Sequence, residues 1–475
     1  MYWNIDYSFE LQKKIAFNFD AIFLVTPNFL DYMFQTFYRK MQVAINSKFI
    51  IAHEFFVVNK GCNLKLTFCK PSKIFACELV SIVNSVKMDS TRKSDSEINL
   101  DSFLKLPLRL CRVAFLNFEP RKSNQPAIER VKNFLKSSFL YFCLFAMFVA
   151  FCMMMAYTFL LAPSFDKVSS TIANISSLVL IASKAITTSV NRTKIWEMFQ
   201  ELEKLFDGRT DKNSAYNVKA YLKSYHRFIK IYSGSFIIVS PVMVLPLVLY
   251  YINGTMTFKV DYWYPFDPYQ PSTFLCASLW TIWIAFTILI FLLGTESLLY
   301  VLISVLVMEF DFLKGDFMKL KDLPKNEMSK AVGKLVDRHN KLLDLSDKLQ
   351  EIYQYSFLTS FVITSMIMCF VAFQLSIAKD FDAYSLYIPF ITIIGGQIFL
   401  LCLFAQNLID SSHAIADGVY ELGWENIDDV RIKRDLILVI MRGNRAKNLS
   451  AMKFSELSLA TFNAVRIFRF FSVDI

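Results

Sequence analysis

The residue types that most often perform catalysis or bind metals are sparse in this sequence and lie far apart. Its four histidines are His53, His226, His339 and His413, and their spacing assembles neither a metal site nor a histidine-assisted nucleophile. The glycine patterns G-x-G-x-x-G and G-x-x-x-x-G-K-[ST], whose backbone N–H groups bind phosphate, are both missing. We therefore expect no enzymatic activity, no metal ion and no cofactor.

Two charged residues, Lys184 and Glu296, lie inside long apolar segments of the sequence. A charge in the hydrocarbon region of a membrane is costly, so each such residue needs an explanation. Lys184 lies near one end of its segment, so we expect its aliphatic stem to extend towards the membrane surface. Glu296 lies deeper, and we expect it to bond a neighbouring serine or backbone group, with a place on an ion path as the alternative.

The apolar segments themselves determine the class of protein. Of the 475 residues, 55% are apolar and 19% are charged, and the apolar residues occur in long blocks. A helix needs about 20 mostly apolar residues to cross a bilayer, and seven segments come near that length. The sequence therefore predicts an all-α membrane protein with seven transmembrane helices. The expected spans are residues 137–162, 170–190, 231–252, 274–307, 356–378, 386–409 and 457–475.

The distribution of lysine and arginine predicts how these spans are oriented. Basic residues are concentrated before span one and in the loops that follow spans two, four and six. The three other loops carry one lysine each, namely Lys167, Lys259 and Lys379. Because basic residues stay on the cytoplasmic side, we expect a cytoplasmic N-terminus and an extracellular C-terminus. The sequon that begins at Asn253 then lies outside the cell, where we expect it to be glycosylated.

The rest of the chain suggests two regions. Residues 1–100 form an N-terminal extension of uncertain structure, for which a gene-model artefact stays open as an explanation, and residues 101–475 form the seven-helix domain. Residues 103–118 mix leucines with basic residues and predict an amphipathic helix at the inner membrane surface. Leucines at helical spacing in residues 334–349 predict that spans four and five continue into the cytoplasm. The net charge is +10, but no compact basic patch indicates a nucleic-acid partner.

The C-terminal part of the chain carries a series of short patterns in a fixed order. They are Ser411 or Ser412 after span six, then Ala416, Tyr420 and Trp424, a basic amphipathic helix that ends in Arg442, and Ser458, Leu459, Thr461 and Phe462. This part of the chain resembles the C-terminal region of the insect odorant receptors. The helix at residues 194–206 and the Tyr264-Pro265-Phe266-Asp267 sequence are also similar to that family, so the resemblance runs from Phe103 to the end.

The resemblance implies an odorant-gated, non-selective cation channel. In that family a divergent ligand-binding subunit assembles with a shared olfactory co-receptor into a heterotetramer in the plasma membrane of sensory-neuron dendrites. This chain does not resemble the co-receptor closely enough to be that subunit. Carried over by position, the cytoplasmic anchor region is residues 410–455, with residues 429–442 as its anchor helix, and the pore helix is residues 457–473. The residues expected in that pore and anchor helix are Ser458, Leu459, Thr461, Phe462 and Val465.

Arg466 and Arg469 depart from the family pattern, because arginines that line a pore oppose the passage of cations. Three explanations stay open: they face the cytoplasm or partner groups, the subunit conducts poorly, or the C-terminus is an imperfect gene model. Two other classes are alternatives. A gustatory receptor of the same superfamily usually carries a Gln-Phe pair in its last span, which is missing after Phe462. A G-protein-coupled receptor would need an extracellular N-terminus.

The family resemblance also indicates where a small, volatile, apolar odorant would bind, in the outer half of the helix bundle. Such a site should be a closed aromatic and aliphatic pocket with few hydrogen-bonding groups. The alternative explanation for the aromatic candidates is a belt at the outer membrane interface. The candidate contacts are Trp280 and Trp283 in span four, Tyr384 and Tyr387 in span six, and Ser240 and Tyr250 in span three.

Overall fold

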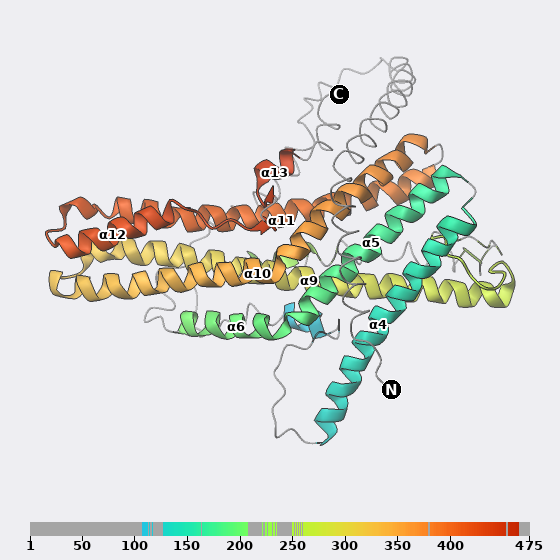
Figure 1. Cartoon of the computed structure of the whole chain (residues 1–475), viewed down its shortest axis with the longest axis horizontal. Helices are drawn as coiled ribbons and strands as arrows, with labels where there is room; N and C mark the ends of the chain where they lie inside the picture. The colour runs from blue at the N-terminus through green and yellow to red at the C-terminus, as the bar shows by residue number, and fades with distance from the viewer. Residues whose placement is uncertain are drawn as a thin grey trace, which may run out of the picture. The chain divides into compact units, whose positions relative to one another are not determined.

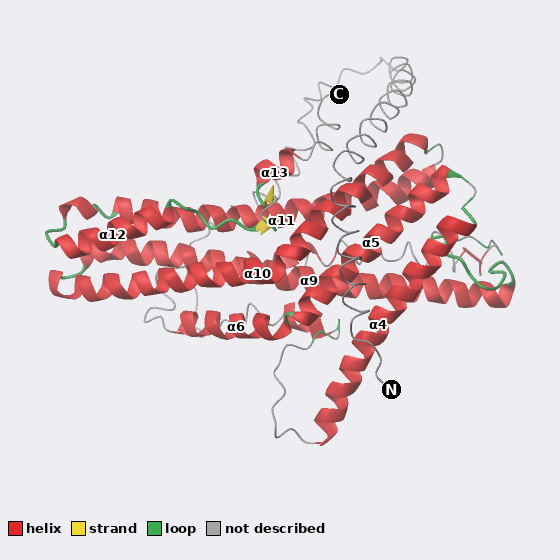
Figure 2. Cartoon of the chain, in the orientation of Figure 1, coloured by secondary structure: helices red, strands yellow, loops and turns green. Residues whose placement is uncertain are grey.

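The computed structural model of the chain describes residues 107–116 in part, 127–162, 164–207, parts of 221–258, and then 260–378, 381–452 and 455–464. These residues are almost entirely helical (Figure 2). Up to Val371 and again from Ser385 they belong to one compact unit, whereas Ala372–Tyr384 fall outside it and are described by themselves.

The first two long helices are α4, Ala127–Leu160, and α5, Phe165–Val190. They pack against each other, and both contact the next long helix, α9 (Figure 1). The amphipathic helix α6, Arg192–Asp207, begins directly after Asn191 and buries its apolar face. Aromatic side chains remain exposed on α4, as expected for a helix that faces lipid. They are Tyr141, Phe142, Phe145 and Phe148.

Three very long helices form the centre of the unit. They are α9, Pro271–Met318, α10, Lys325–Ile377, and α11, Phe381–Glu421. Each is much longer than the roughly 20 residues that a bilayer requires, so each extends beyond it. The short 3-10 helix η2, Lys319–Asp322, and Pro324 separate α9 from α10, because proline is favoured only at the start of a new helix. The helices therefore continue between expected spans four and five, as the leucine pattern predicted.

The chain turns back after α11 and lays a shorter helix against it. Gly423 has φ of 73°, which is the left-handed conformation that glycine tolerates best, and it leads into η3, Trp424–Asn426. Helix α12, Val430–Gly443, is capped by Asp429, whose side chain accepts a hydrogen bond from the Arg431 N–H at 2.8 Å. In Figure 1, α12 runs beside α11, and a Cβ at Gly443 would lie 3.0 Å from the Ala416 Cβ.

A small antiparallel sheet follows α12. Strand β1, Ser450–Ala451, pairs with β2, Ser455–Glu456, with Ser450 opposite Glu456. The Gln350 side chain on α10 extends this sheet, since its amide donates to the Ser450 carbonyl at 2.6 Å and accepts from the Ser450 N–H at 2.8 Å. The last described helix is α13, Leu459–Ala464.

Five helices in the described part of the chain are long and apolar enough to cross a membrane. They coincide with expected spans one, two, four, five and six. Expected spans three and seven lie largely outside the described residues. The candidate helices are Ser137–Leu160, Phe165–Val190, Pro271–Asp322, Asn326–Ile377 and Tyr387–Asn426.

The segment expected to be an amphipathic helix contacts α9 directly. Residues 107–112 are helical, with Arg109 exposed and Cys111 completely buried. The Cys111 thiol donates to the Gly294 carbonyl at 3.2 Å, and a Cβ at Gly294 would lie 3.1 Å from the Ala114 Cβ. Glycine at position 294 thus allows this segment to approach α9 closely.

Candidate functional site

The two tryptophans proposed as ligand contacts have different surroundings on α9. Trp283 is 38% exposed, and its ring centroid lies 6.0 Å from that of Phe139 and 6.3 Å from that of Phe142, both on α4. Trp280 is half-buried, and its indole Nε1 is buried without a hydrogen-bond partner among the described residues. Because a buried indole N–H usually has a partner, the Trp280 N–H is a donor that the described part of the chain does not use.

The two tyrosines proposed as contacts also differ. The Tyr387 hydroxyl shares a hydrogen bond of 3.2 Å with the Ser170 hydroxyl, which connects α11 to the beginning of α5. The Tyr384 hydroxyl instead donates to the Ala378 carbonyl at 3.0 Å, within the segment Ala372–Tyr384. Only Tyr387 therefore offers a hydroxyl pair between two helices of the main unit.

The structure describes only some of the other residues predicted for the site. The Tyr250 ring lies 4.8 Å from the Phe274 ring at the beginning of α9. Ser240, Asn253 and Val465 lie outside the described residues. Sequence reasoning did not identify Ser170, and its position three residues after Lys167 gives no signal that it would meet span six.

Residues 260–269, called here the 260–269 loop, are attached to three helices. The Trp263 N–H donates to the Met153 carbonyl of α4 at 3.1 Å. Lys167 of α5 pairs with Asp261 at 3.0 Å. The Tyr264 hydroxyl donates to the Ala277 carbonyl of α9 at 3.4 Å. The loop thereby covers the same end of the bundle that carries Trp280 and Tyr387.

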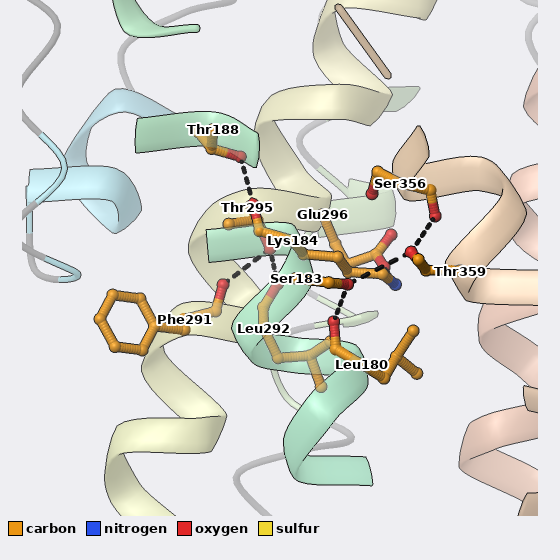
Figure 3. A network of polar contacts seen from close by, with 10 residues as sticks. All are labelled: Leu180, Ser183, Lys184, Thr188, Phe291, Leu292, Thr295, Glu296, Ser356 and Thr359. Carbon is orange, nitrogen blue, oxygen red and sulfur yellow. Dashed lines mark hydrogen bonds and ion pairs between the residues drawn. The ribbon is translucent and has the colours of Figure 1, made fainter. Parts of the chain in front are cut away.

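Lys184 and Glu296 form a buried ion pair between α5 and α9, and this corrects the separate roles expected for them (Figure 3). Only 10% of the Lys184 side chain and 4% of the Glu296 side chain are exposed. The lysine therefore points into the bundle instead of towards the membrane surface. A buried carboxylate needs such a partner, because an isolated buried charge is far more costly than a paired one.

Polar side chains of three helices gather beside this pair. The Ser183 hydroxyl shares a hydrogen bond of 3.2 Å with the Thr359 hydroxyl of α10, and Thr359 also donates to the Ser356 carbonyl (Figure 3). On α9, Thr295 donates to the Phe291 carbonyl at 2.8 Å. Lys184, Glu296 and these hydroxyls join α5, α9 and α10 at one level of the bundle.

Beyond this level, α9 lies in a tightly packed bundle with charged pairs. Arg338 of α10 pairs with the completely buried Glu309 at 2.6 Å and donates to the Leu205 carbonyl of α6 at 3.2 Å. The Tyr221 hydroxyl donates to Asp311, and burial together with this carboxylate raises the pKa of Tyr221. These contacts fix α6 and α10 on α9.

In the anchor region, Ser412 of the resemblance motif and Lys447 connect α11, the segment after α12 and α10. The Ser412 hydroxyl accepts a hydrogen bond from the Lys447 N–H at 3.0 Å, and Lys447 pairs with Asp347 of α10 at 2.6 Å. Ile432, Leu436, Val439 and Gly443 form the buried face of α12. Its other face leaves apolar side chains exposed. They are Val430, Ile437, Leu438 and Met441.

The residues expected in the pore helix begin as a capped helix. The Ser458 hydroxyl accepts from the Thr461 N–H at 3.1 Å, and the Leu459 N–H donates to Gln406 of α11 at 3.4 Å. The Phe462 ring lies 5.3 Å from that of Phe399. The start of α13 is therefore attached to α11, while Arg466 and Arg469 lie outside the described residues.

Comparison with known proteins identifies the family. Residues 164–468, which are more than half of the chain, match a family model described as "7tm Odorant receptor". The chain belongs to the odorant receptor family. As a member of a receptor family it is not an enzyme, and the gustatory and G-protein-coupled alternatives are set aside.

Individual odorant receptors and solved structures agree with this assignment. Odorant receptor 67a of Drosophila melanogaster is 24% identical over 313 residues, which cover 62% of this chain and 75% of the relative. Odorant receptor 85c of the same species is 29% identical over 170 residues, 36% of this chain and 43% of the relative. The structure of the olfactory receptor OR5 from Machilis hrabei in complex with eugenol matches with a TM-score of 0.66 at 15% identity, over 78% of this chain and 98% of that one. At this identity the match establishes a shared fold, so the chain is an all-α, seven-helix, multi-pass membrane protein of the odorant receptor family, as predicted.

Proposed function

We propose that this receptor is the ligand-binding subunit of an odorant-gated, non-selective cation channel. Membership of the odorant receptor family is the observation that carries the proposal. The N-terminus is then cytoplasmic and the C-terminus extracellular, so the end of the bundle with the 260–269 loop faces outward. The long extensions of α9, α10 and α11, together with α12, lie in the cytoplasm.

The proposed odorant is a small volatile molecule, largely apolar, with one hydrogen-bonding group. Trp280 supports this ligand class, because its buried indole N–H has no partner in the described part of the chain and would donate to an oxygen of the ligand. Ser170 and Tyr387 are the second anchor, because a ligand hydroxyl or carbonyl can insert into their hydrogen bond. Trp283 fits a position at the lipid interface better, since much of its ring is exposed.

The proposed partner is the olfactory co-receptor, in a heterotetramer. The exposed apolar face of α12 supports an interface, because a charged helix normally exposes few apolar side chains to water: Leu438 is 56% and Met441 is 62% exposed. Ser458, Leu459, Thr461, Phe462 and Val465 then begin the helix that lines the shared pore. The complex resides in the plasma membrane of a sensory-neuron dendrite, with Asn253 glycosylated outside.

The proposal is tested by co-expressing the chain with an insect olfactory co-receptor and recording currents during application of an odorant panel. We expect an odorant-evoked cation current that needs both subunits. Substitution Trp280→Phe removes the indole N–H together with part of the ring volume. Loss of the donor should lower sensitivity to odorants that carry an oxygen more than sensitivity to hydrocarbons of the same size, which feel only the lost volume. Surface delivery without any odorant-evoked current across a broad panel would contradict the proposal.

Orientation is tested separately by attaching an epitope tag to either terminus and staining intact cells. The proposed topology predicts that only a C-terminal tag binds antibody before permeabilisation. An N-terminal tag that is stained on intact cells would overturn it.

A further inference from the structure

We propose that the ion pair of Lys184 and Glu296 couples odorant binding to channel opening by fixing α5 on α9. The inference rests on the proposed function, and it assigns to these two residues a positioning role. Neither side chain is proposed to touch the odorant, because both are almost fully buried against each other.

Burial of this ion pair between two helices carries a large desolvation cost. Both charged side chains are almost fully buried, and their removal from water costs more than a simple apolar contact would. Replacement of a buried pair by apolar residues is often neutral for stability, whereas loss of one partner is strongly destabilising. A role in the relative position of the two helices explains the pair better than a contribution to stability does.

The position of the pair connects the two functional ends of the chain. Near the beginning of α5, Ser170 meets Tyr387, which belongs to the proposed ligand site. Lys184 lies about four turns further along the same helix. Glu296 lies on α9, which continues without a break to Glu309 and the contact with Arg338. A displacement of α5 by a ligand therefore reaches the long extension of α9 through this contact.

The contact can change in discrete steps because it is built from directional interactions. Ser183, next to Lys184, shares its hydroxyl hydrogen bond with Thr359 of α10 (Figure 3). A shift of α5 along its axis thus alters one ion pair to α9 and one hydrogen bond to α10 together. Apolar burial alone would add no comparable directional preference, since the hydrophobic effect is non-directional.

The test uses the full receptor with its co-receptor and compares three changes. Lys184→Met removes one charge, Lys184→Met with Glu296→Met removes both, and Lys184→Glu with Glu296→Lys reverses the pair. Lys194→Met is the matched control, because Lys194 forms an exposed ion pair with Glu351 at 2.6 Å. Surface biotinylation, basal current, maximal current per surface receptor and the half-maximal odorant concentration are measured for each.

We expect Lys184→Met to reduce surface delivery, because Glu296 is left buried and unpaired. The double methionine variant should recover surface delivery and shift basal current or half-maximal concentration by about fivefold or more, the usual size of a coupling effect. The reversed pair should lie between the double methionine variant and the wild type. Lys194→Met should match the wild type throughout.

Two results would overturn the inference. A double methionine variant with wild-type delivery, basal current and odorant sensitivity would make the pair a structural contact only. A double methionine variant that fails to reach the surface would make the pair a requirement of folding. If the wild type itself gives no current, the proposed function fails, while the delivery measurements still decide whether the two charges depend on each other.

Discussion

The two halves of α9 have opposite surroundings although they belong to one helix. In residues 271–290, large side chains such as Leu279, Trp283 and Phe286 remain exposed. From Phe291 to Leu313 almost every side chain is buried, including the charged Glu296 and Glu309. The difference indicates that packing constrains the side chains of the C-terminal half more than those of the N-terminal half, which under the proposed function lies beside the ligand.

The largest effect is expected where the C-terminal half of α9 meets α10. Arg338→Met removes the ion pair between Arg338 and the completely buried Glu309, and we expect a loss of roughly 3–5 kcal/mol in the free energy of unfolding. Thermal unfolding in detergent and the fraction at the cell surface measure this effect. Lys348→Met is the control, because the pair of Lys348 and Glu201 is exposed, and a change of at most about 1 kcal/mol is expected. Equal losses for both variants would contradict the difference between the two halves.

The pH dependence of stability tests the same packed region through His339. Burial, with smaller contributions from Arg442 and Lys447, lowers the pKa of His339 to about 4 from its ordinary value of 6.5. As the pH falls below 6.5, the unfolded chain binds a proton that the folded protein resists until about pH 4. Folding stability therefore decreases across this window, by up to about 3 kcal/mol. Thermal unfolding at pH 7.5 and pH 5 should show a smaller loss for His339→Phe than for the wild type.

His413 supplies the control for this measurement, because its side chain is exposed. The His413→Phe variant should retain the wild-type difference between pH 7.5 and pH 5. If His339→Phe also retains the wild-type difference in stability between the two pH values, another group causes the loss, and burial of His339 is not its origin.

A smaller effect is expected at Gly294, where the two halves of α9 meet. A Cβ there would approach the Ala114 Cβ to 3.1 Å and the Leu110 carbonyl oxygen to 3.5 Å. Gly294→Val should therefore cost about 1–3 kcal/mol through overpacking. Gly396→Val on α11 has no atom within 4 Å of its new Cβ and should be tolerated. The difference between the unfolding temperatures of the two variants measures this effect. A larger loss for Gly396→Val than for Gly294→Val would contradict the close approach at Gly294.

The smallest effect is expected among the tyrosines of α11. Tyr387→Phe breaks the hydrogen bond with Ser170 and should change odorant sensitivity by roughly fivefold, about 1 kcal/mol. Tyr384→Phe should change it little, because that hydroxyl donates to the Ala378 carbonyl near by in the chain. Dose-response curves for both variants, with the co-receptor present, provide the measurement. A larger change in odorant sensitivity for Tyr384→Phe than for Tyr387→Phe would make Tyr384, and not Tyr387, the ligand contact.

The sequence predicted the helices well because its apolar segments are long. Spans one, two, four, five and six follow directly from those segments, and Gly423 and Asp429 mark the helix ends that surround η3. The pairing of Lys184 with Glu296 did not follow, because 112 residues separate them and only the packing of α5 on α9 brings them together. One opposite charge in each of two apolar spans was the signal that could have suggested it.

The candidate site was predicted by residue type but not by role. Helical spacing placed Trp280 and Trp283 one turn apart, and likewise Tyr384 and Tyr387. Spacing within one helix does not determine which side chain meets a neighbouring helix. Ring contacts with α4 separate Trp283 from Trp280, and the hydroxyl of Ser170 separates Tyr387 from Tyr384. Both distinctions depend on side chains supplied by other helices.

The separation of Lys184 and Glu296 along the chain also has a consequence for membrane insertion during synthesis. A ribosome adds about 5–20 residues per second, so the 112 residues between them take roughly 6–20 seconds. During that time Lys184 lacks the counter-charge of Glu296. A lysine costs about 2.5–3.5 kcal/mol at the centre of an inserting helix and less towards the end of the helix, where Lys184 lies. The membrane-length part of α5 is also less apolar than that of α4, with a mean hydropathy of 1.3 for Phe165–Val190 against 2.4 for Ser137–Leu160. We therefore expect stable insertion of the newly made α5 to depend on its packing against α4, which is already in the bilayer, until α9 inserts and Glu296 can pair with Lys184.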